Sequence, residues 1–384
     1  MIIPFSCPSC SNEIEAEVKG MKRRVVTCTS CNNEVQIPDD LPIGPGVVIG
    51  NGYKLYSKIG DTSLGDLYLA DRNGSKFTVE VLSGETSKDQ EKVTRLMQET
   101  DLIASMEHPH IVKAIEAGQD NETYFLVTAF EPGMPLSDYL KQNGPLTCGE
   151  ALTIATHIAE ALKYAWEEKR LLHRDIKPHN IFVTESGEAR LTGFGIAKAS
   201  GGPSLGLTGI GFTIGTPEYM SPEQIRAADD LDFRSDLYAL GCVLYESVCG
   251  GMPFQETAPM LLVQKHMDEV PEPAIDRNPD VTPACSDLID KMLLKDRSER
   301  QGSWQELIDE MADAIANPGE PKAQKSAAAA DPAPAPSSGH VGVAGSDIQK
   351  EATSSSKTML VAGVAIGLVI VVLLIMLVVL LTNK

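Results

Sequence analysis

The chain has 384 residues, a formal net charge of −20 and an apolar content of 42 %. This length allows two or three folding units, and the apolar content is ordinary for globular domains with a sizeable core. Residues 1–38 and 317–358 each carry as many basic as acidic side chains, so the negative charge lies between residues 39 and 316. So acidic a segment repels polyphosphates at long range, and nucleic acid is therefore not expected as a partner.

Four cysteines near the start of the chain have the spacing of metal ligands. Cys7 and Cys10 form one C-x-x-C pair, and Cys28 and Cys31 form a second. Such a spacer lets both sulfurs of a pair reach one ion, and two pairs complete a tetrahedral zinc site. Together with the strand-like runs "EIEAEV" and "RRVVTC", the spacing makes residues 1–38 resemble a zinc ribbon. Its zero net charge favours a structural or protein-docking role.

The remaining cysteines lack metal-ligand spacing and are expected to be ordinary core or surface residues: Cys148, Cys242, Cys249 and Cys285.

Residues 39–52 are rich in Pro and Gly and are predicted to be a connector. After them, "YKLYSKIG", "GDLYLADRN" and "KFTVEVL" have the pattern of short strands, and residues 87–106 have helical spacing of apolar positions. Residues 110–130 read as two further strands. From Thr147 onward helices dominate, beginning with a capping box formed by Thr147 and Glu150. Strands followed by helices predict an α+β domain of two lobes over residues 53–316.

Three motifs in this domain carry a family resemblance. They are "HRDIKPHN" at 173–180, "GTPEYMSPEQ" at 215–224 and "SDLYALGCVLYESVCGGMPF" at 235–254. Each motif is specific, and together they stand in the order found in protein kinases. Residues 53–316 therefore resemble a Ser/Thr protein kinase of the bacterial Hanks type, which implies the two-lobed protein-kinase fold, with ATP and magnesium as the usual cofactors.

The resemblance implies an intact site for the hydroxyl that accepts the phosphoryl group. Asp175 matches the catalytic base, Lys177 the lysine that steadies the phosphoryl group, and Asn180 a magnesium ligand. Three other residues match positions that brace the helical lobe: Glu223 and Arg300 as a buried ion pair, and Asp236 as the anchor of the catalytic loop. Thr216 matches the threonine that joins the substrate-binding loop to the catalytic loop.

The nucleotide side departs from the family. In the glycine-rich loop Gly60 and Gly65 are kept, but Thr62 replaces the middle glycine, and its side chain obstructs close approach of phosphates. Glu80 replaces the lysine that grips the phosphates, and Glu99 matches the glutamate that normally pairs with that lysine. Three outcomes relieve two facing carboxylates: an outward helix movement, a proton on one carboxylate, or an intervening base such as Arg95.

Gly193 in "GFG" replaces the aspartate that binds magnesium, while Phe194 keeps its packing position. The rest of the predicted nucleotide pocket consists of Leu67 in the loop, Thr78 as its roof and Phe182 as a bulky floor. Loss of the lysine and a metal ligand weakens binding of Mg-ATP and predicts a pseudokinase.

The end of the chain has two further segments. Residues 317–358 are rich in Pro, Ala and Ser and are predicted to be a disordered linker. Residues 359–382 contain no charge and are long enough for a transmembrane helix. Because the N-terminus lacks the pattern of a secretory signal, the helix is predicted to be a C-terminal anchor with the ribbon and kinase-like domain in the cytoplasm. Gly363 and Gly367 form a small-xxx-small pair that favours a homodimer.

Three hypotheses about function remain open from the sequence. The first is a membrane-anchored signalling adaptor whose pseudokinase domain recruits a protein partner, such as an active kinase. The second is an active Ser/Thr protein kinase that uses Asp175 as base despite its altered nucleotide site. The third is a structural protein of the membrane surface in which the ribbon carries recognition.

Overall fold

The structure is a computed structural model that describes residues 1–17, 25–37, 43–62, 65–83, 94, 102–121, 123–194 and 217–321. The predicted helix over 87–106, including Arg95 and Glu99, lies largely outside these residues, as do Thr216, most of the predicted linker, and the 359–382 segment with Gly363 and Gly367. In the described part of the chain no helix has both the length and the apolar character needed to cross a membrane.

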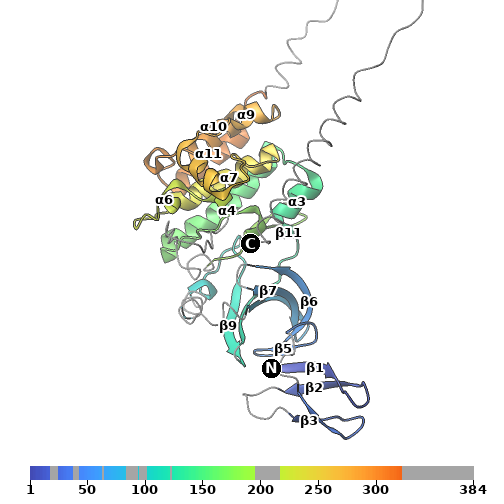
Figure 1. The fold of residues 1–384 in the computed structure, drawn as a ribbon. Coiled ribbons are helices and arrows are strands. Elements are labelled where there is room, and N and C mark those ends of the chain that lie inside the picture. The colour runs from blue at the N-terminus through green and yellow to red at the C-terminus, as the bar shows by residue number, and fades with distance from the viewer. Residues whose placement is uncertain are drawn as a thin grey trace, which may run out of the picture. The chain divides into compact units, whose positions relative to one another are not determined.

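An antiparallel sheet of eight strands forms the first half of the fold (Figure 1). Its order is β2-β1-β5-β6-β7-β8-β10-β9. The strands are β1 (Ile2–Ser6), β2 (Glu13–Glu17), β5 (Val48–Ile49), β6 (Tyr53–Asp61), β7 (Gly65–Arg72), β8 (Ser75–Leu82), β9 (Ala114–Asp120) and β10 (Thr123–Ala129). The strand-like runs predicted in the first lobe correspond to β6, β7, β8, β9 and β10.

The N-terminal segment predicted as a zinc ribbon is joined to the kinase-like domain, because its first strand extends the sheet of that domain. The predicted connector contains β5, which pairs with β1 at Ile2 and Val48 and with β6 on its other side. The amine of Met1 lies 3.0 Å from Oδ1 of Asp120 at the end of β9. Ile3 is buried in the same apolar cluster as Val79. The second ribbon hairpin, β3 (Val25–Thr27) and β4 (Glu34–Gln36), is a separate two-stranded sheet.

Helices form the second half of the fold and share one large apolar core. The capping box of Thr147 and Glu150 begins α4 as expected. The α-helices are α3 (Leu136–Asn143), α4 (Cys148–Lys169), α6 (Pro222–Ile225), α7 (Arg234–Cys249), α8 (Pro259–Asp268), α9 (Ala274–Arg277), α10 (Pro283–Met292) and α11 (Trp304–Ala316). Short 3-10 turns are η1 (Pro178–Asn180), η2 (Pro217–Tyr219) and η3 (Arg297–Glu299).

A small sheet of three strands adjoins these helices and carries the loops of the candidate site. It consists of β11 (Met134–Pro135), β12 (Ile181–Val183) and β13 (Ala189–Leu191). The strand β12 follows directly after "HRDIKPHN", and β13 leads directly into "TGFG". Because β12 and β13 pair with each other, residues 173–180 and 192–194 are brought side by side.

Candidate functional site

Two side chains of the catalytic loop, those of Lys177 and Asn180, contact Asp175. Nζ of Lys177 lies 2.8 Å from Oδ2 of Asp175. The amide of Asn180 donates to the backbone carbonyl of Asp175 at 2.8 Å and to its Oδ2 at 3.0 Å. The predicted acceptor-side residues therefore form one cluster, and Asp175 keeps about a fifth of its side chain exposed to solvent.

A buried carboxylate beneath this loop fixes its backbone. Both oxygens of Asp236, the third residue of α7, accept backbone N–H groups, from His173 and Arg174, each at 2.7 Å. Arg174 has φ +66°, a backbone conformation that residues other than glycine adopt only at an energetic cost. The two hydrogen bonds to Asp236 stabilise this backbone conformation. Burial lowers the pKa of His173, whose neutral ring donates from Nε2 to the carbonyl of Thr192 at 2.9 Å.

The predicted ion pair of the helical lobe is present. Nη1 of Arg300 donates to Oε1 of Glu223 at 2.7 Å, and Nη2 donates to Oε2 at 3.1 Å. Both residues are buried, and the remaining N–H groups of Arg300 reach backbone carbonyls such as that of Leu294. This bidentate geometry satisfies a buried charge that would otherwise be costly, so the pair braces the lobe.

Glu80 is buried in the middle of the first-lobe sheet. It lies on β8 opposite Leu67 of β7 and Leu126 of β10, and the residue is 5 % exposed. Because residues directly opposite one another share a face of the sheet, Leu67 and Leu126 flank the carboxyl group. Burial raises the pKa of Glu80, which favours its neutral, protonated form.

The hydroxyl of Thr62 provides the hydrogen bond that satisfies this buried group. Oγ1 of Thr62 donates to Oε1 of Glu80. The same Oγ1 accepts the backbone N–H of Gly65 at 3.2 Å, which holds the end of the loop against the side chain. Gly65 itself packs so closely on β8 that a Cβ there would lie 1.9 Å from the carbonyl oxygen of Val81. The loop is therefore anchored over Glu80.

No cation takes the place of the missing lysine among the residues that the structure describes. Lys58 pairs with Asp61 and lies 3.0 Å from Oδ1 of Asp66 at the exposed edge of β6 and β7. Nζ of Lys76 lies over the ring of Phe130, 5.6 Å from its centroid. These contacts direct both lysines away from Glu80.

Gly193 occupies a backbone conformation suited to glycine. Its φ is +86°, and a Cβ at this position would lie 3.1 Å from Nδ2 of Asn180. The two positions at which the family holds metal are therefore adjacent, but only Asn180 offers a side-chain ligand. Phe194, which follows, is buried and meets the His173 ring edge-on, 4.6 Å between ring centroids. The structural half of the motif is retained, as predicted.

The other predicted pocket residues lie on strands β6, β8 and β12. Thr78 lies two residues before Glu80 on β8 and is half-buried, and Phe182 lies on β12 and is half-buried. Gly60 lies on β6 opposite Leu67, with open space where a Cβ would be. The residues present do not fit Mg-ATP bound in the family's manner, because the phosphate side presents a buried carboxyl group and a glycine where a cation and a metal ligand are needed.

Comparison with known proteins gives the same fold for this domain. Residues 53–311 match the family "Protein kinase domain". The chain belongs to the protein kinase family.

Similar proteins include the probable serine/threonine-protein kinase CPE1738 of Clostridium perfringens, which is 33 % identical over 69 % of this chain and 38 % of the relative. The serine/threonine-protein kinase PrkC of Bacillus subtilis is 33 % identical over 66 % of this chain and 39 % of the relative. The crystal structure of the PknI kinase domain of Mycobacterium tuberculosis matches 72 % of this chain and 99 % of that chain, with TM-score 0.57 and 27 % identity.

These matches support kinase-type signalling. The names of the relatives favour the alternative hypothesis, an active kinase, over a pseudokinase. The chain spans about two fifths of the length of the curated relatives, so what those whole proteins do is not carried over to it directly.

The kinase domain is preceded by a cluster of four thiols. The sulfur atoms of Cys7, Cys10, Cys28 and Cys31 all lie within 4.8 Å of one another. Sγ of Cys7 and Sγ of Cys31 are 3.7 Å apart, as are those of Cys10 and Cys28. Tetrahedral zinc with Zn–S bonds of about 2.3 Å places its sulfur ligands about 3.8 Å apart, so the donor set and spacing fit zinc.

Sequence reasoning missed the contact between Thr62 and Glu80. It placed both positions among the losses on the phosphate side but predicted no contact between them. The sequence did contain a signal for this contact. The resemblance aligns Thr62 with the middle glycine of the phosphate loop and Glu80 with the lysine that binds the phosphates. In the family, both positions contact the same phosphates, so they lie close together. A hydroxyl and a carboxyl group that replace them in one chain are a hydrogen-bonding pair. Of the three predicted outcomes, a raised pKa of Glu80 agrees with the structure, with burial as its cause and Thr62 as a hydrogen-bond partner. The helix movement and the role of Arg95 stay predictions, because Arg95 and Glu99 lie outside the described residues.

Proposed function

We propose that this protein is a signalling pseudokinase, a member of the Ser/Thr protein kinase family whose nucleotide site is closed. The observation that carries the proposal is the buried Glu80, with Thr62 hydrogen-bonded to it. A phosphate-binding loop needs backbone N–H groups and a cation directed at the phosphates. Here the loop hydroxyl is directed at a buried carboxyl group in the sheet. Gly193 removes the metal ligand on the opposite side.

The proposed role is that of an adaptor or allosteric partner. The kinase-like domain offers a rigid scaffold, with Asp236 and the ion pair of Glu223 and Arg300 bracing its helical lobe, for binding a protein partner such as an active kinase. Zinc held by Cys7, Cys10, Cys28 and Cys31 would fix the ribbon against the sheet. Residues 359–382 would anchor the protein in a membrane, with Gly363 and Gly367 at a dimer contact and both folded parts on the cytoplasmic side.

A second candidate is an active Ser/Thr protein kinase. Two observations favour it: the names of its relatives, and the contact of Asp175 with Lys177 and Asn180. In that case Asp175 would accept the proton of the substrate hydroxyl, with a nucleotide bound differently from the family's manner.

A phosphoryl-transfer assay separates the two candidates. The full-length protein is incubated with γ-labelled ATP, magnesium or manganese, and a general protein substrate. Asp175→Asn serves as the matched control because it keeps the size of the side chain. The proposal predicts the same background label for wild type and variant. Transfer by the wild type that disappears in Asp175→Asn would establish the second candidate.

A further inference from the structure

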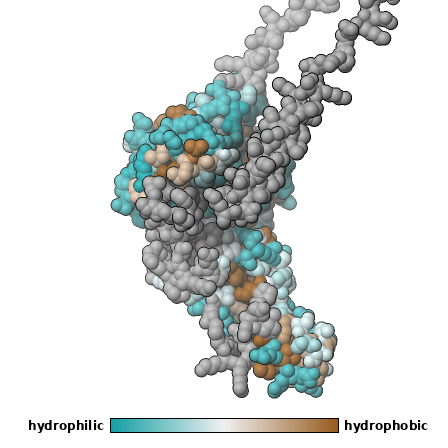
Figure 2. Space-filling view, in the orientation of Figure 1, coloured by the Kyte–Doolittle hydropathy of each residue, from teal (hydrophilic) through white to brown (hydrophobic). Residues whose placement is uncertain are grey.

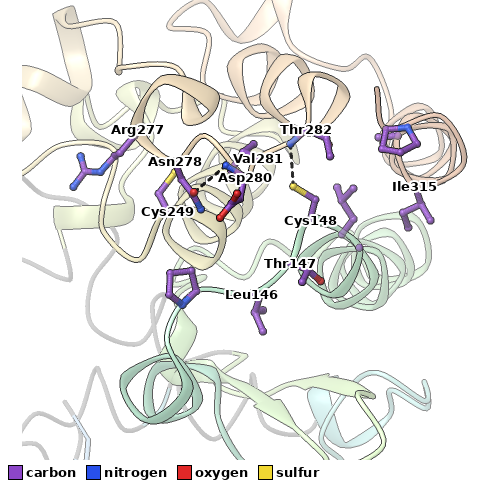
Figure 3. A pocket seen from close by; sticks show the side chains of 15 residues that line it. Leu146, Thr147, Cys148, Cys249, Arg277, Asn278, Asp280, Val281, Thr282 and Ile315 are labelled. Atoms are coloured by element: carbon purple, nitrogen blue, oxygen red, sulfur yellow. Dashed lines mark hydrogen bonds between the residues drawn. The ribbon is translucent and has the colours of Figure 1, made fainter. Parts of the chain in front are cut away.

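A cavity of about 760 Å³ lies in the helical lobe and is separate from the candidate site. Its walls come from the start of α4, the end of α7, the segment between α9 and α10, and the end of α11. Figure 3 shows Cys249 with Arg277 and Asn278 on one wall, and Cys148 with Thr282 directly beside it on another. None of Asp175, Glu80 or Gly193 lines it.

Cys148 lies where two helix N-termini meet. It is the first residue of α4, directly after the N-cap Thr147. The backbone N–H of Thr282, the N-cap of α10, donates to Sγ of Cys148 at 3.4 Å (Figure 3). Helix N-termini carry partial positive charge, so both helices favour a negative charge on this sulfur.

A second thiol completes the arrangement. Cys285 lies in the first turn of α10 and is fully buried. Its backbone N–H donates to Oγ1 of Thr282 at 3.4 Å, and the N–H of the same Thr282 donates to Sγ of Cys148, so the two cysteines meet at this helix N-terminus. The neighbouring Cys285 side chain and the N–H of Thr282 lower the pKa of Cys148 to about 6, although burial opposes the shift. The proximity of Cys148 and burial raise the pKa of Cys285. One sulfur of the pair is therefore a thiolate near neutral pH and its neighbour remains a thiol.

The surroundings differ from those of a structural core cysteine. Cys242, on α7, is fully buried in the lobe, and burial raises its pKa to about 12. Cys148 is only half-buried and lines an open cavity, so small solutes can reach it. A nucleophilic thiolate with access and an adjacent thiol is the arrangement in which cysteine oxidation is selective.

We propose that Cys148 is a redox-modification site that reacts with small hydroperoxides, with Cys285 as the resolving thiol. This proposal departs from the sequence-based expectation that both are ordinary cysteines. The site does not depend on whether the kinase-like domain is catalytically active.

The chemistry balances with a hydroperoxide as the two-electron oxidant. The Cys148 thiolate attacks one peroxide oxygen, the O–O bond breaks, and the released hydroxide or alkoxide takes a proton from water. The product is a sulfenic acid on Cys148. The sulfur of Cys285 then attacks that sulfur, its proton goes to the departing oxygen, and water leaves as the disulfide forms. The bond would link the first turns of α4 and α10, and a dithiol would reverse it.

The first test is peptide mapping of the full-length, zinc-loaded protein after brief exposure to hydrogen peroxide. The wild type should give a linked peptide containing Cys148 and Cys285, which dithiothreitol separates. With dimedone present during the exposure, Cys285→Ser should carry the adduct on Cys148, and Cys148→Ser should give neither product at these positions. Absence of the linked peptide in the folded wild type, or dimedone capture of Cys249 to the same extent as Cys148, would overturn the proposal.

The second test needs no variant. Iodoacetamide alkylation of each cysteine is followed by mass spectrometry over a range of pH. The rate at Cys148 should level off above its pKa of about 6, whereas Cys249 lines the same cavity and has a pKa raised by burial to about 12. The rate at Cys249 should therefore keep rising about tenfold for each pH unit. Parallel profiles for the two cysteines would refute a reactive Cys148.

Discussion

The hydroxyl of Thr62 donates a hydrogen bond to the buried carboxyl group of Glu80, so two positions at which this chain departs from other kinases are in direct contact. A middle-loop threonine alone would crowd the phosphates, and a glutamate alone would bury an unsatisfied carboxyl group in the sheet. Together they satisfy each other. The proposed scaffold role requires a nucleotide site that is stable without nucleotide, and this hydrogen-bonded pair would contribute to that stability.

The raised pKa of Glu80 predicts a pH-dependent stability. The folded protein holds the proton more tightly than the unfolded chain, whose carboxyl has the usual pKa of 4.5. The contribution is therefore complete below pH 4.5 and is lost as pH rises through the folded-state pKa. Glu80→Gln keeps an oxygen that accepts from Thr62 but does not ionise. Relative to wild type, its unfolding free energy should increase by up to about 1.4 kcal/mol for each pH unit in that window.

Urea unfolding of both proteins from below pH 4.5 to neutral pH checks this prediction. The exposed Glu185, replaced by Gln, is the matched control and should follow the wild type throughout. A difference between Glu80→Gln and wild type that stays constant with pH would show that Glu80 titrates alike in the folded and unfolded chains.

Restoring the family residues should restore nucleotide binding only in combination. Glu80→Lys alone supplies a cation, but the Thr62 side chain still lies over it and position 193 still lacks a metal ligand. The triple variant Thr62→Gly, Glu80→Lys, Gly193→Asp provides loop, cation and metal ligand together. Isothermal titration with Mg-ATP should detect binding to the triple variant and none to Glu80→Lys. A folded triple variant that binds no Mg-ATP would place the obstruction elsewhere in the pocket.

Gly193→Asp should destabilise the domain for two separable reasons. A side chain at φ +86° costs about 1–2 kcal/mol, and its Cβ would press on the amide of Asn180. Gly187 has a similar φ of +82° with nothing within 4 Å of a Cβ. Gly187→Asp is therefore the control for backbone strain alone, and Gly193→Asp should unfold at lower urea concentration than Gly187→Asp. Equal midpoints would mean that Asn180 moves aside freely.

Breaking the buried ion pair should have a large effect on stability. Glu223→Ala leaves Arg300 buried without its carboxylate, which costs about 3–5 kcal/mol. The exposed pair of Lys141 and Asp138 is the control, and Asp138→Asn should change the unfolding midpoint little because solvent screens that pair. If both variants shift the midpoint equally, the pair of Glu223 and Arg300 does not brace the lobe.

Zinc removal should destabilise the first lobe as well as the ribbon, since β1 belongs to both. Native mass spectrometry should find one zinc per wild-type chain and none in Cys7→Ser/Cys28→Ser, while Cys249→Ser keeps the metal. Loss of zinc should also lower the unfolding temperature, because it releases β1 from β5 and the Met1 amine from Asp120. Zinc-free wild-type protein with an unchanged unfolding temperature would refute this coupling.

Much of the kinase fold could be predicted from the sequence because its signals are local. The capping box at Thr147 and the alternating residues of β6, β7 and β8 depend on near neighbours in the chain. The contacts around Asp175 could be expected because "HRDIKPHN" places them within a few residues of one another. The pairing of β1 with β5 could not be predicted, because β5 consists of only two residues in a Pro/Gly-rich stretch and gives no periodic signal.

Contacts between side chains from distant segments also could not be predicted from the sequence. Cys148 and Cys285 are far apart in the sequence, and neither has a spacing that marks a site. Their meeting depends on how α4 and α10 pack. The exposed apolar surface does not single out one docking site for a partner. Figure 2 shows hydrophobic residues both near the N-terminal segment and among the helices. The large exposed hydrophobic residues include Tyr56 and Ile59 on β6 and Met260 and Leu261 on α8.

Thermal unfolding of the full-length protein with millimolar ATP, in magnesium and in EDTA, tests the closed nucleotide site most directly. A ligand at about a hundred times its Kd adds roughly 2.7 kcal/mol, which raises the unfolding temperature of a domain of this size by several degrees. The closed site predicts the same unfolding temperature with and without ATP in both conditions. A rise of several degrees with ATP would contradict it and would show that the pocket accepts nucleotide despite Thr62, Glu80 and Gly193.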